Sequence, residues 1–331
     1  MKQRSGFISQ RYTNMLEVIV VQKRQEAEGV CSFELRRENG QPLPVFTAGA
    51  HIDVHVSADI TRQYSLCNSP MERDRYLIAV LYEPLSRGGS RGMHELVGVG
   101  DRLSISAPKN HFPLKAGARR SVLLGGGIGI TPMLAMAFQL SHGVSEFELH
   151  YCVREPRRAA FLQHIAASGF AENVHLHFDS GERDQRLDVN HVLAEPQEDS
   201  HLYVCGPNGF MDSVINAAQD LGWSTEQIHR EYFAAAVVPH DTDHAFEVEL
   251  VESGLVLQVP TDKSVLEVLC AYGIELPASC LQGVCGACMT GVIDGIPDHR
   301  DVFMSEKEHG LNDQFTPCCS RSKSQRLVLA L

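Results

Sequence analysis

The spacing of cysteines near the C-terminus constrains this chain more than any other feature. Cys280, Cys285 and Cys288 form a C-x4-C-x2-C run, and the adjacent Cys318 and Cys319 begin after a gap of 29 residues. Four thiolates with this spacing are typical of a plant-type [2Fe–2S] cluster. Zinc sites usually pair two C-x2-C units, so the pattern favours iron over a zinc knuckle or four buried thiols. The spacing alone leaves the fourth ligand open between Cys318 and Cys319.

Two glycines inside the run suit a loop around such a cluster. Four thiolates, two ferric ions and two sulfides carry a net negative charge, which favours backbone N–H groups directed at the sulfurs. Gly283 and Gly286 permit the tight turns that would supply them. The cysteines without metal-binding spacing are expected to be buried, inert thiols: Cys31, Cys67, Cys152 and Cys270.

Length and charge narrow the class of protein. A chain of 331 residues is expected to form two or three compact units. Clustered thiols without a secretory signal indicate the reducing cytoplasm, and no apolar run approaches the roughly 20 residues of a membrane span. A net charge of −12 argues against nucleic acid as a partner. It suits a basic protein partner better.

Two segments with different sequence patterns precede the cysteine-rich region. Short alternating apolar runs over residues 15–115 predict an antiparallel barrel or sandwich. Strands alternate with helical patterns over 116–233, and this alternation predicts a parallel α/β sheet. One of the helices is expected at 157–167. Residues 1–14 are expected to be a loose tail and 234–244 a linker.

The last segment, residues 245–331, is expected to be a small mixed α+β domain. Its two first apolar runs predict a hairpin, followed by a helix with a capping box from Ser264 to Glu267 and a stop at Gly273. It holds twelve Asp and Glu against six Lys and Arg, so its net charge is −6. This charge would steer a basic docking surface or would simply favour solubility.

Two motifs in the first segment suggest a flat, phosphorylated cofactor. Arg62, Tyr64 and Ser65 follow a predicted barrel strand, and the turn Gly88-Gly89-Ser90 precedes a predicted helix. An arginine and a Gly-Gly-Ser turn can bind a phosphate, while Tyr64 offers a ring. A surface arginine and an ordinary turn would produce the same pattern.

The second segment carries signals of a dinucleotide. The stretch GGGIGITP, from Gly125 to Pro132, follows a predicted strand and opens a helix, where glycines let a pyrophosphate approach backbone N–H groups. Pro132 replaces the third glycine of the usual fingerprint, which suits a first helical turn. Cys205-Gly206-Pro207 ends a later strand, where open α/β sheets bind ligands.

In this order, R-x-Y-S, G-G-x-G-I-T-P and C-G-P resemble the ferredoxin–NADP reductase superfamily. With the cysteine run, the whole chain from residue 15 to 331 resembles the phthalate dioxygenase reductase family, through RQYSLCN, GGIGITPML, YVCGP, HREYFAAA, PDHRD and NDQFTPCCSRSKS. The resemblance implies a flavin β-barrel, a nicotinamide α/β domain and a β-grasp ferredoxin domain. It also implies FMN rather than FAD, NADH as electron donor, and delivery of electrons to a separate Rieske-type non-haem iron oxygenase of aromatic catabolism. The reductase is expected to be a monomer.

The resemblance also assigns residues. It selects Cys318 as the fourth cluster ligand and leaves Cys319 to packing. Thr131, Cys205 and Phe233 are expected at the reacting rings, where Cys205 would orient the nicotinamide and Phe233 would pack at the flavin unless it only ends a core strand. The cofactor-binding residues are expected to be Arg62, Tyr64, Ser65, Ala79, Val80, Gly88, Gly89, Ser90, Gly126, Gly127, Gly129, Thr131, Pro132, Asp179, Cys205, Gly206, Pro207 and Phe233.

Some assignments stay open. Asp179 would accept a hydrogen bond from the adenosine ribose or would be a solvated loop residue, and Arg154 would instead suit a 2′-phosphate. His299 and Arg300 belong to the PDHRD motif without an assigned role. The competing functions are a redox-sensing [2Fe–2S] flavoprotein that regulates a partner, and a self-contained flavin oxidase with a structural metal.

Overall fold

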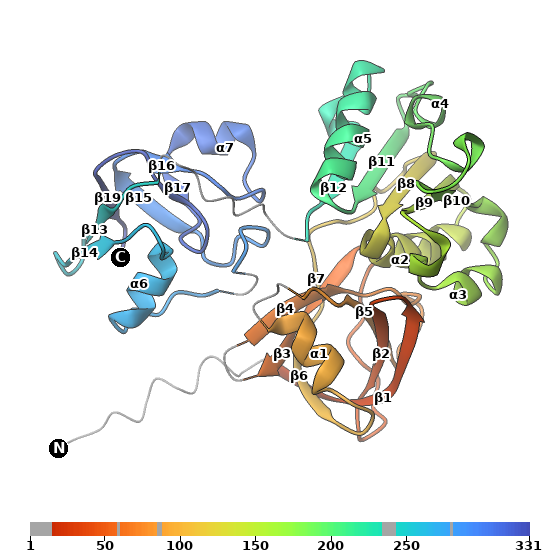
Figure 1. Ribbon diagram of the computed structural model, residues 1–331, viewed down its shortest axis with the longest axis horizontal. Coiled ribbons are helices and arrows are strands. Elements are labelled where there is room, and N and C mark those ends of the chain that lie inside the picture. The colour runs from red at the N-terminus through yellow and green to blue at the C-terminus, as the bar shows by residue number, and fades with distance from the viewer. Residues whose placement is uncertain (1–14, 58–59, 85–87, 234–242, 279–280) are drawn as a thin grey trace. The chain divides into compact units, whose positions relative to one another are not determined.

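The computed structural model of the chain describes residues 15–57, 60–84, 88–233, 243–278 and 281–331. The chain divides into two compact units, Met1–Glu231 and Tyr232–Leu331, and Figure 1 shows the elements of each. The first unit contains two sheets, so this division does not separate residues 15–115 from 116–233. The domain boundaries expected at residues 115 and 245 therefore stay predictions. Among the described residues, no helix combines the length and apolarity of a membrane span.

The first sheet is an antiparallel barrel, as the alternating apolar runs predict. Its strands run in the order β4-β3-β6-β1-β2-β5, with β7 beside β3, and a bridge between Leu66 and Ile78 joins the end of β4 to β5. Alternate side chains of β1, β2, β3, β5 and β6 enter one core, and Tyr64 of β4 packs against it. The elements are β1 (Met15–Ala27), β2 (Val30–Arg36), β3 (Ala50–Ser57), β4 (Ile60–Ser65), β5 (Tyr76–Leu81), α1 (Gly89–Glu95), β6 (Arg102–Ser106) and β7 (Lys109–Asn110).

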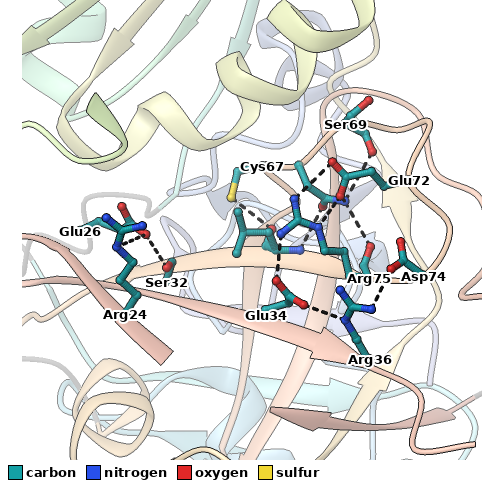
Figure 2. A network of polar contacts seen from close by, with 12 residues as sticks. Arg24, Glu26, Ser32, Glu34, Arg36, Cys67, Ser69, Glu72, Asp74 and Arg75 are labelled. Atoms are coloured by element: carbon teal, nitrogen blue, oxygen red, sulfur yellow. Dashed lines mark hydrogen bonds and ion pairs between the residues drawn. The ribbon is translucent and has the colours of Figure 1, made fainter. Parts of the chain in front are cut away.

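A polar network holds the loop that follows β4 (Figure 2). Arg75 binds Glu34 of β2 at 2.9 Å and also pairs with Glu72. Arg36, also on β2, binds Asp74 at 2.8 Å. Because the loop is tied to β2 by charge-assisted contacts, the strand β4 that carries the flavin motif has a fixed end.

The second sheet is fully parallel, with strand order β10-β9-β8-β11-β12. The chain starts in the middle at β8, moves outward through β9 and β10, and then returns to the other side of β8 through β11. The carboxyl ends of β8 and β11 therefore form a topological switch point, where such sheets bind ligands. The strands are β8 (Arg120–Gly126), β9 (Glu146–Val153), β10 (Val174–Phe178), β11 (Ser200–Cys205) and β12 (Ile228–Glu231).

The helices of this sheet are α2 (Ile130–Ser141), α3 (Leu162–Ala166), α4 (Val189–Val192) and α5 (Asn208–Asp220), with 3-10 turns η2 (Gly127–Gly129), η3 (Pro156–Arg158), η4 (Ala171–Asn173), η5 (Arg183–Gln185) and η6 (Thr225–Gln227). The helix expected at 157–167 is wrong in its first half. Phe161 adopts a left-handed φ of 62° and is buried, so the helix begins only after it. Burial of this ring overrides the local helical pattern.

Backbone groups tie the barrel to the parallel sheet within the first unit. The Lys115 N–H donates to the Tyr203 hydroxyl at 2.7 Å. The Ala48 N–H donates to Gln139 Oε1 of α2 at 3.1 Å, and the Glu28 N–H donates to the Arg157 carbonyl at 3.0 Å. These bonds come from three separate parts of the barrel and its exit segment, so the two sheets form one body.

The second unit is a mixed sheet of order β14-β13-β19-β15-β17 with a small β16-β18 pair. The predicted hairpin is present as β13 and β14, and the predicted capping box of Ser264 and Glu267 starts α6. The central strands β13 and β19 are parallel, which with α6 across the sheet gives the β-grasp fold. The elements are β13 (Phe246–Leu250), β14 (Val256–Val259), α6 (Val265–Ala271), β15 (Thr290–Asp294), β16 (Pro297–Asp298), α7 (Glu306–Leu311), β17 (Gln314–Phe315), β18 (Arg321–Ser322) and β19 (Arg326–Leu329).

Arg300, left without a role by the sequence, anchors the entry to this unit. Its guanidinium donates to Asp298 at 2.8 Å and to Asp243 at 3.1 Å. Asp243 is the next described residue after 233 and lies near the end of the linker expected at 234–244. The neighbouring Arg321 donates to the carbonyls of His244 and Pro260. Arg300 of the PDHRD motif and Arg321 therefore hold the segment that leads into β13.

Candidate flavin, nucleotide and iron–sulfur sites

The glycine loop after β8 and the loop after β11 touch backbone to backbone. A Cβ added to Gly129 would lie 2.2 Å from the Cys205 carbonyl oxygen, and one added to Gly126 would lie 2.8 Å from the Phe210 ring. Gly127 has a positive φ of 56°. The two predicted nucleotide motifs therefore meet at the switch point, and glycine is needed there to let the loops approach.

The two side chains expected beside the nicotinamide are buried in these loops. Cys205 is fully buried, and this burial raises the pKa of its thiol, with the nearby Glu231 carboxyl adding to the effect. The thiol is therefore neutral and suited to orienting a ring rather than attacking it. Thr131 donates its hydroxyl to the Ile128 carbonyl at 2.9 Å. Pro132 lies in the first turn of α2, as expected.

Glu231 is the site residue that the sequence analysis missed. It ends β12, pairs in register with Cys205 of β11, and accepts a hydrogen bond from the Ser65 hydroxyl of β4 at 3.3 Å. The residue is half-buried, but burial of its carboxyl raises its pKa to about 8, partly offset by the Ser65 hydrogen bond. Residues of the flavin motif, the C-G-P motif and the HREYF motif thus converge on one acid that is mostly protonated at neutral pH.

The phosphate motif is also assembled from separate elements. A Cβ on Gly89 would lie 2.6 Å from Cγ and Nε of Arg62, so the arginine crosses the turn directly. Gly88 precedes α1 with a φ of 88°. The Ser90 hydroxyl accepts the Glu83 N–H at 3.1 Å, which closes the loop around the turn. The structure therefore places the guanidinium against the Gly-Gly-Ser turn.

The remaining flavin residues lie nearby in the barrel. Tyr64 is half-buried, and burial raises the pKa of its phenol, so it stays protonated. Ala79 and Val80 are buried in β5. The Val80 carbonyl is contacted by His94 Nε2 at 2.8 Å and its backbone faces β2. Ala79 is therefore the better placed of the two to offer its backbone to a ring.

Two predicted residues lie at the outer strand ends, and one falls in the other unit. Asp179 follows β10 and donates its backbone N–H to the Val153 carbonyl at 3.1 Å, while Arg154 follows β9. Both side chains are exposed at the carboxyl edge of the sheet, so either is available to an adenosine ribose.

Phe233 is half-buried and belongs to the second unit, which begins at Tyr232.

The cysteine loop fits a [2Fe–2S] cluster in its backbone. Gly283 and Gly286 have positive φ values of 73° and 65°, and a Cβ on Gly286 would lie 2.4 Å from the Phe303 ring. The Ala287 N–H is directed at the Cys285 sulfur at 3.5 Å, the arrangement that an anionic cluster favours. Of the expected ligands, Cys285, Cys288 and Cys318 are described, whereas Cys280 lies outside the described residues.

Cys319, expected to have a packing role, is buried among hydroxyl groups. Its sulfur lies 3.3 Å from the Thr316 hydroxyl and 3.9 Å from the Ser320 hydroxyl. A Cβ on Gly283 would lie 2.5 Å from this sulfur, so Cys319 packs against the back of the cysteine loop. This position suits a packing role, and Cys318 stays the predicted fourth ligand.

Comparison with known proteins identifies the family. Residues 248–323 match the family described as "2Fe-2S iron-sulfur cluster binding domain". The chain is 54% identical over 318 residues to vanillate O-demethylase oxidoreductase from Pseudomonas putida, covering 96% of this chain and 100% of that protein. The solved structure of phthalate dioxygenase reductase is similar with a TM-score of 0.78 and 38% identity, covering 96% of this chain and 98% of that one. The chain belongs to the phthalate dioxygenase reductase family.

Membership of the phthalate dioxygenase reductase family confirms the fold class and the activity expected from the sequence. The chain is an electron-transfer oxidoreductase with a flavin and nicotinamide reductase fold and a [2Fe–2S] ferredoxin domain. Within the family, the quoted motifs predict the greatest likeness to vanillate demethylase reductases. Relatives of that name at 54%, 50% and 45% identity confirm the likeness.

In this member of the phthalate dioxygenase reductase family, substituting Glu231 should change how the stability of the protein depends on pH. The pKa of Glu231 is raised from 4.5 to about 8, so the folded state holds a proton that the unfolded state releases. The stability from that proton is complete below pH 4.5 and is lost as pH rises through about 8. We expect Glu231→Gln to match the wild type near pH 5 and to melt at least about 3 °C higher near pH 9.

Melting temperatures between pH 5 and 9 test this expectation. Glu226→Gln, at an exposed position in η6, is the matched control and should follow the wild type throughout. Parallel pH profiles for the wild type and Glu231→Gln would show that the Glu231 carboxyl ionises normally.

Proposed function

We propose that the chain is the reductase component of a two-component Rieske non-haem iron oxygenase that acts on an aromatic acid. It would take electrons from NADH through FMN and the [2Fe–2S] cluster and deliver them to the oxygenase. The observation that carries this proposal is the match over at least 95% of relatives named as a vanillate O-demethylase oxidoreductase and a phthalate 4,5-dioxygenase reductase subunit. Vanillate is the first substrate to test for the partner.

The chain's own residues would bind and orient the two ring systems. A flavin bound by these residues would supply the conversion between two-electron and one-electron transfer. Arg62 and the turn at Gly88-Gly89-Ser90 would hold the single phosphate of FMN, and the ring would lie along Tyr64, Ser65 and the Ala79 backbone. The contact between Arg62 and Gly89 supports this assignment.

The nucleotide would bind across the switch point. Gly126, Gly127 and Gly129 would let the pyrophosphate approach the start of α2, and Cys205, Gly206 and Pro207 would line the nicotinamide. Asp179 would accept a ribose hydroxyl, which supports NADH as the donor. Thr131 and Phe233 are proposed to border the reacting rings.

Glu231 would hold a proton at its carboxyl beside the Ser65 hydroxyl. Glu231 Oε2 accepts the Ser65 hydroxyl at 3.3 Å, so this hydrogen bond would hold the carboxyl against the flavin motif. An uncharged group here avoids repelling electron-rich rings. The carboxyl is therefore proposed as a positioning group and not as an obligatory acid, because hydride transfer requires no proton donor.

The second unit would dock to the oxygenase. Four thiolates from Cys280, Cys285, Cys288 and Cys318 are proposed to hold the cluster, and the net charge of −6 over residues 245–331 would attract a basic surface. Such steering weakens with salt. The chain is proposed to act as a monomer in this complex.

Reconstitution tests the proposal. The purified protein is mixed with candidate Rieske oxygenases, and NADH consumption is measured with vanillate, phthalate or no aromatic acid. We expect NADH oxidation to depend on one oxygenase and its aromatic acid, to fall as salt increases, and the flavin released by denaturation to be FMN. NADH oxidation that no oxygenase accelerates would contradict the partner, and released FAD would contradict the flavin assignment.

A further inference from the structure

Three histidines and a glutamate gather on one face of the parallel sheet, away from its ligand-binding edge. Glu148 and His150 are two residues apart on β9, and His175 and His177 are two residues apart on β10, so each pair faces one side. The register pairs His150 with His175 directly. β9 and β10 lie side by side in Figure 1. None of these four residues belongs to the sites described above.

The polar atoms of this group are within the reach of a single ion. Glu148, His150 and His175 each offer a ligand atom, and these atoms lie within 4.8 Å of one another. The distance from His150 Nε2 to Glu148 Oε2 is 3.1 Å. The rings of His150 and His175 are stacked with centroids 4.9 Å apart. Side chains from two adjacent strands thus converge before any ion is bound.

Two further residues hold the convergent groups in place. His177 Nε2 lies 3.0 Å from the other ring nitrogen of His150, Nδ1. Arg120 of β8 binds the second carboxylate oxygen of Glu148, Oε1. A histidine that ligates a metal usually bonds its other nitrogen to a partner, and a ligating carboxylate is likewise supported. His150 and Glu148 each have such a supporting contact, from His177 and Arg120 respectively.

We propose that Glu148, His150 and His175 bind a divalent transition-metal cation such as Zn²⁺. The cation would take the place of the proton between Glu148 Oε2 and His150 Nε2, with His175 as the third ligand. Two imidazoles and a carboxylate form a ligand set that Zn²⁺ accepts in proteins, leaving a fourth position to water. Because β10 ends next to Asp179, the ion would fix the strand that leads into the proposed ribose site.

The group is open to solvent on one side. His150 is buried, whereas His175 is exposed. An ion can therefore enter from solvent at His175.

A second group of similar composition, in the other unit, does not carry the same inference. His299, Asp301 and His309 also converge, but both carboxylate oxygens of Asp301 already accept hydrogen bonds. One accepts the Met304 N–H at 2.9 Å and the other accepts the Thr316 hydroxyl at 3.2 Å. This carboxylate is committed to the local backbone.

Metal uptake by the intact protein, with flavin and cluster in place, tests the proposal. The protein is dialysed against ZnCl₂, and zinc and iron are measured together by mass spectrometry, so that zinc entering the cysteine site would appear as lost iron. We expect one zinc per chain beside about two iron ions. We expect His175→Gln, an exposed substitution that should leave the fold intact, to weaken zinc binding at least about tenfold.

His191→Gln is the matched control, because His191 is exposed on α4 and outside the group. It should bind zinc as the wild type does. The proposal is overturned if the wild type takes up no zinc at about 100 μM, a weak limit for a three-ligand site. It is also overturned if His175→Gln binds zinc unchanged, or if both substitutions weaken binding equally. None of these results depends on electron transfer to an oxygenase.

Discussion

The variant Cys318→Ser is expected to lose its iron and to stop reducing the oxygenase while it keeps its flavin. A serine hydroxyl stays protonated at neutral pH and replaces a thiolate poorly, so three cysteines would have to hold the cluster. We expect cluster-dependent electron transfer to fall about a hundredfold or more. NADH-dependent reduction of ferricyanide, which small acceptors can draw from the flavin, should change less than about twofold.

Cys319→Ser is the control that the adjacent cysteine provides. Its thiol is buried against Thr316 and Ser320, and serine can make the same hydrogen bonds. We expect this variant to keep its iron and its EPR signal. The opposite pattern, with iron lost from Cys319→Ser and retained in Cys318→Ser, would assign the fourth ligand to Cys319.

The substitution Gly129→Ala is expected to damage the nucleotide site more than any other single methyl group there. The added Cβ would meet the Cys205 carbonyl oxygen at 2.2 Å and the Gly206 nitrogen at 2.7 Å. Backbone atoms cannot rotate away as a side chain can, so the two loops must separate. We expect a loss of about 2 kcal/mol in stability. The kcat/KM for NADH should fall about a hundredfold, because positioning errors near 1 Å have this effect.

Gly209→Ala is the control, because it adds the same methyl group near the start of α5. No atom lies within 4 Å of the new Cβ there. It should leave kcat/KM unchanged and stabilise the helix slightly. Steady-state NADH–ferricyanide kinetics and thermal melting of both variants provide the comparison. Equal kinetics for Gly129→Ala and the wild type would mean that NADH does not bind across these loops.

Local patterns were sufficient for the elements and motifs that depend on nearby residues. The capping box at Ser264 needs only Glu267, three residues on, and it is present. The glycine loop from Gly126 to Gly129 is bounded by its own strand and helix. The shortened α3 shows the limit, because burial of Phe161 decides where that helix begins.

The contacts that the sequence did not reveal join residues far apart in the chain. Ser65 and Glu231 are 166 positions apart, and Arg300 and Asp243 are 57 apart. No spacing rule connects such pairs. A strand histidine is equally uninformative alone, and only the register between β9 and β10 brings His150 beside His175.

The division between Glu231 and Tyr232 falls where no sheet is interrupted. Among the described strands, β1 to β12 pair only within the first unit and β13 to β19 only within the second. Cutting or splicing the gene at this point would therefore expose no unpaired strand edge to aggregation. We therefore expect evolution or protein engineering to be able to exchange the electron carrier at the C-terminus, provided that the new junction keeps Phe233 with the hydride-accepting half.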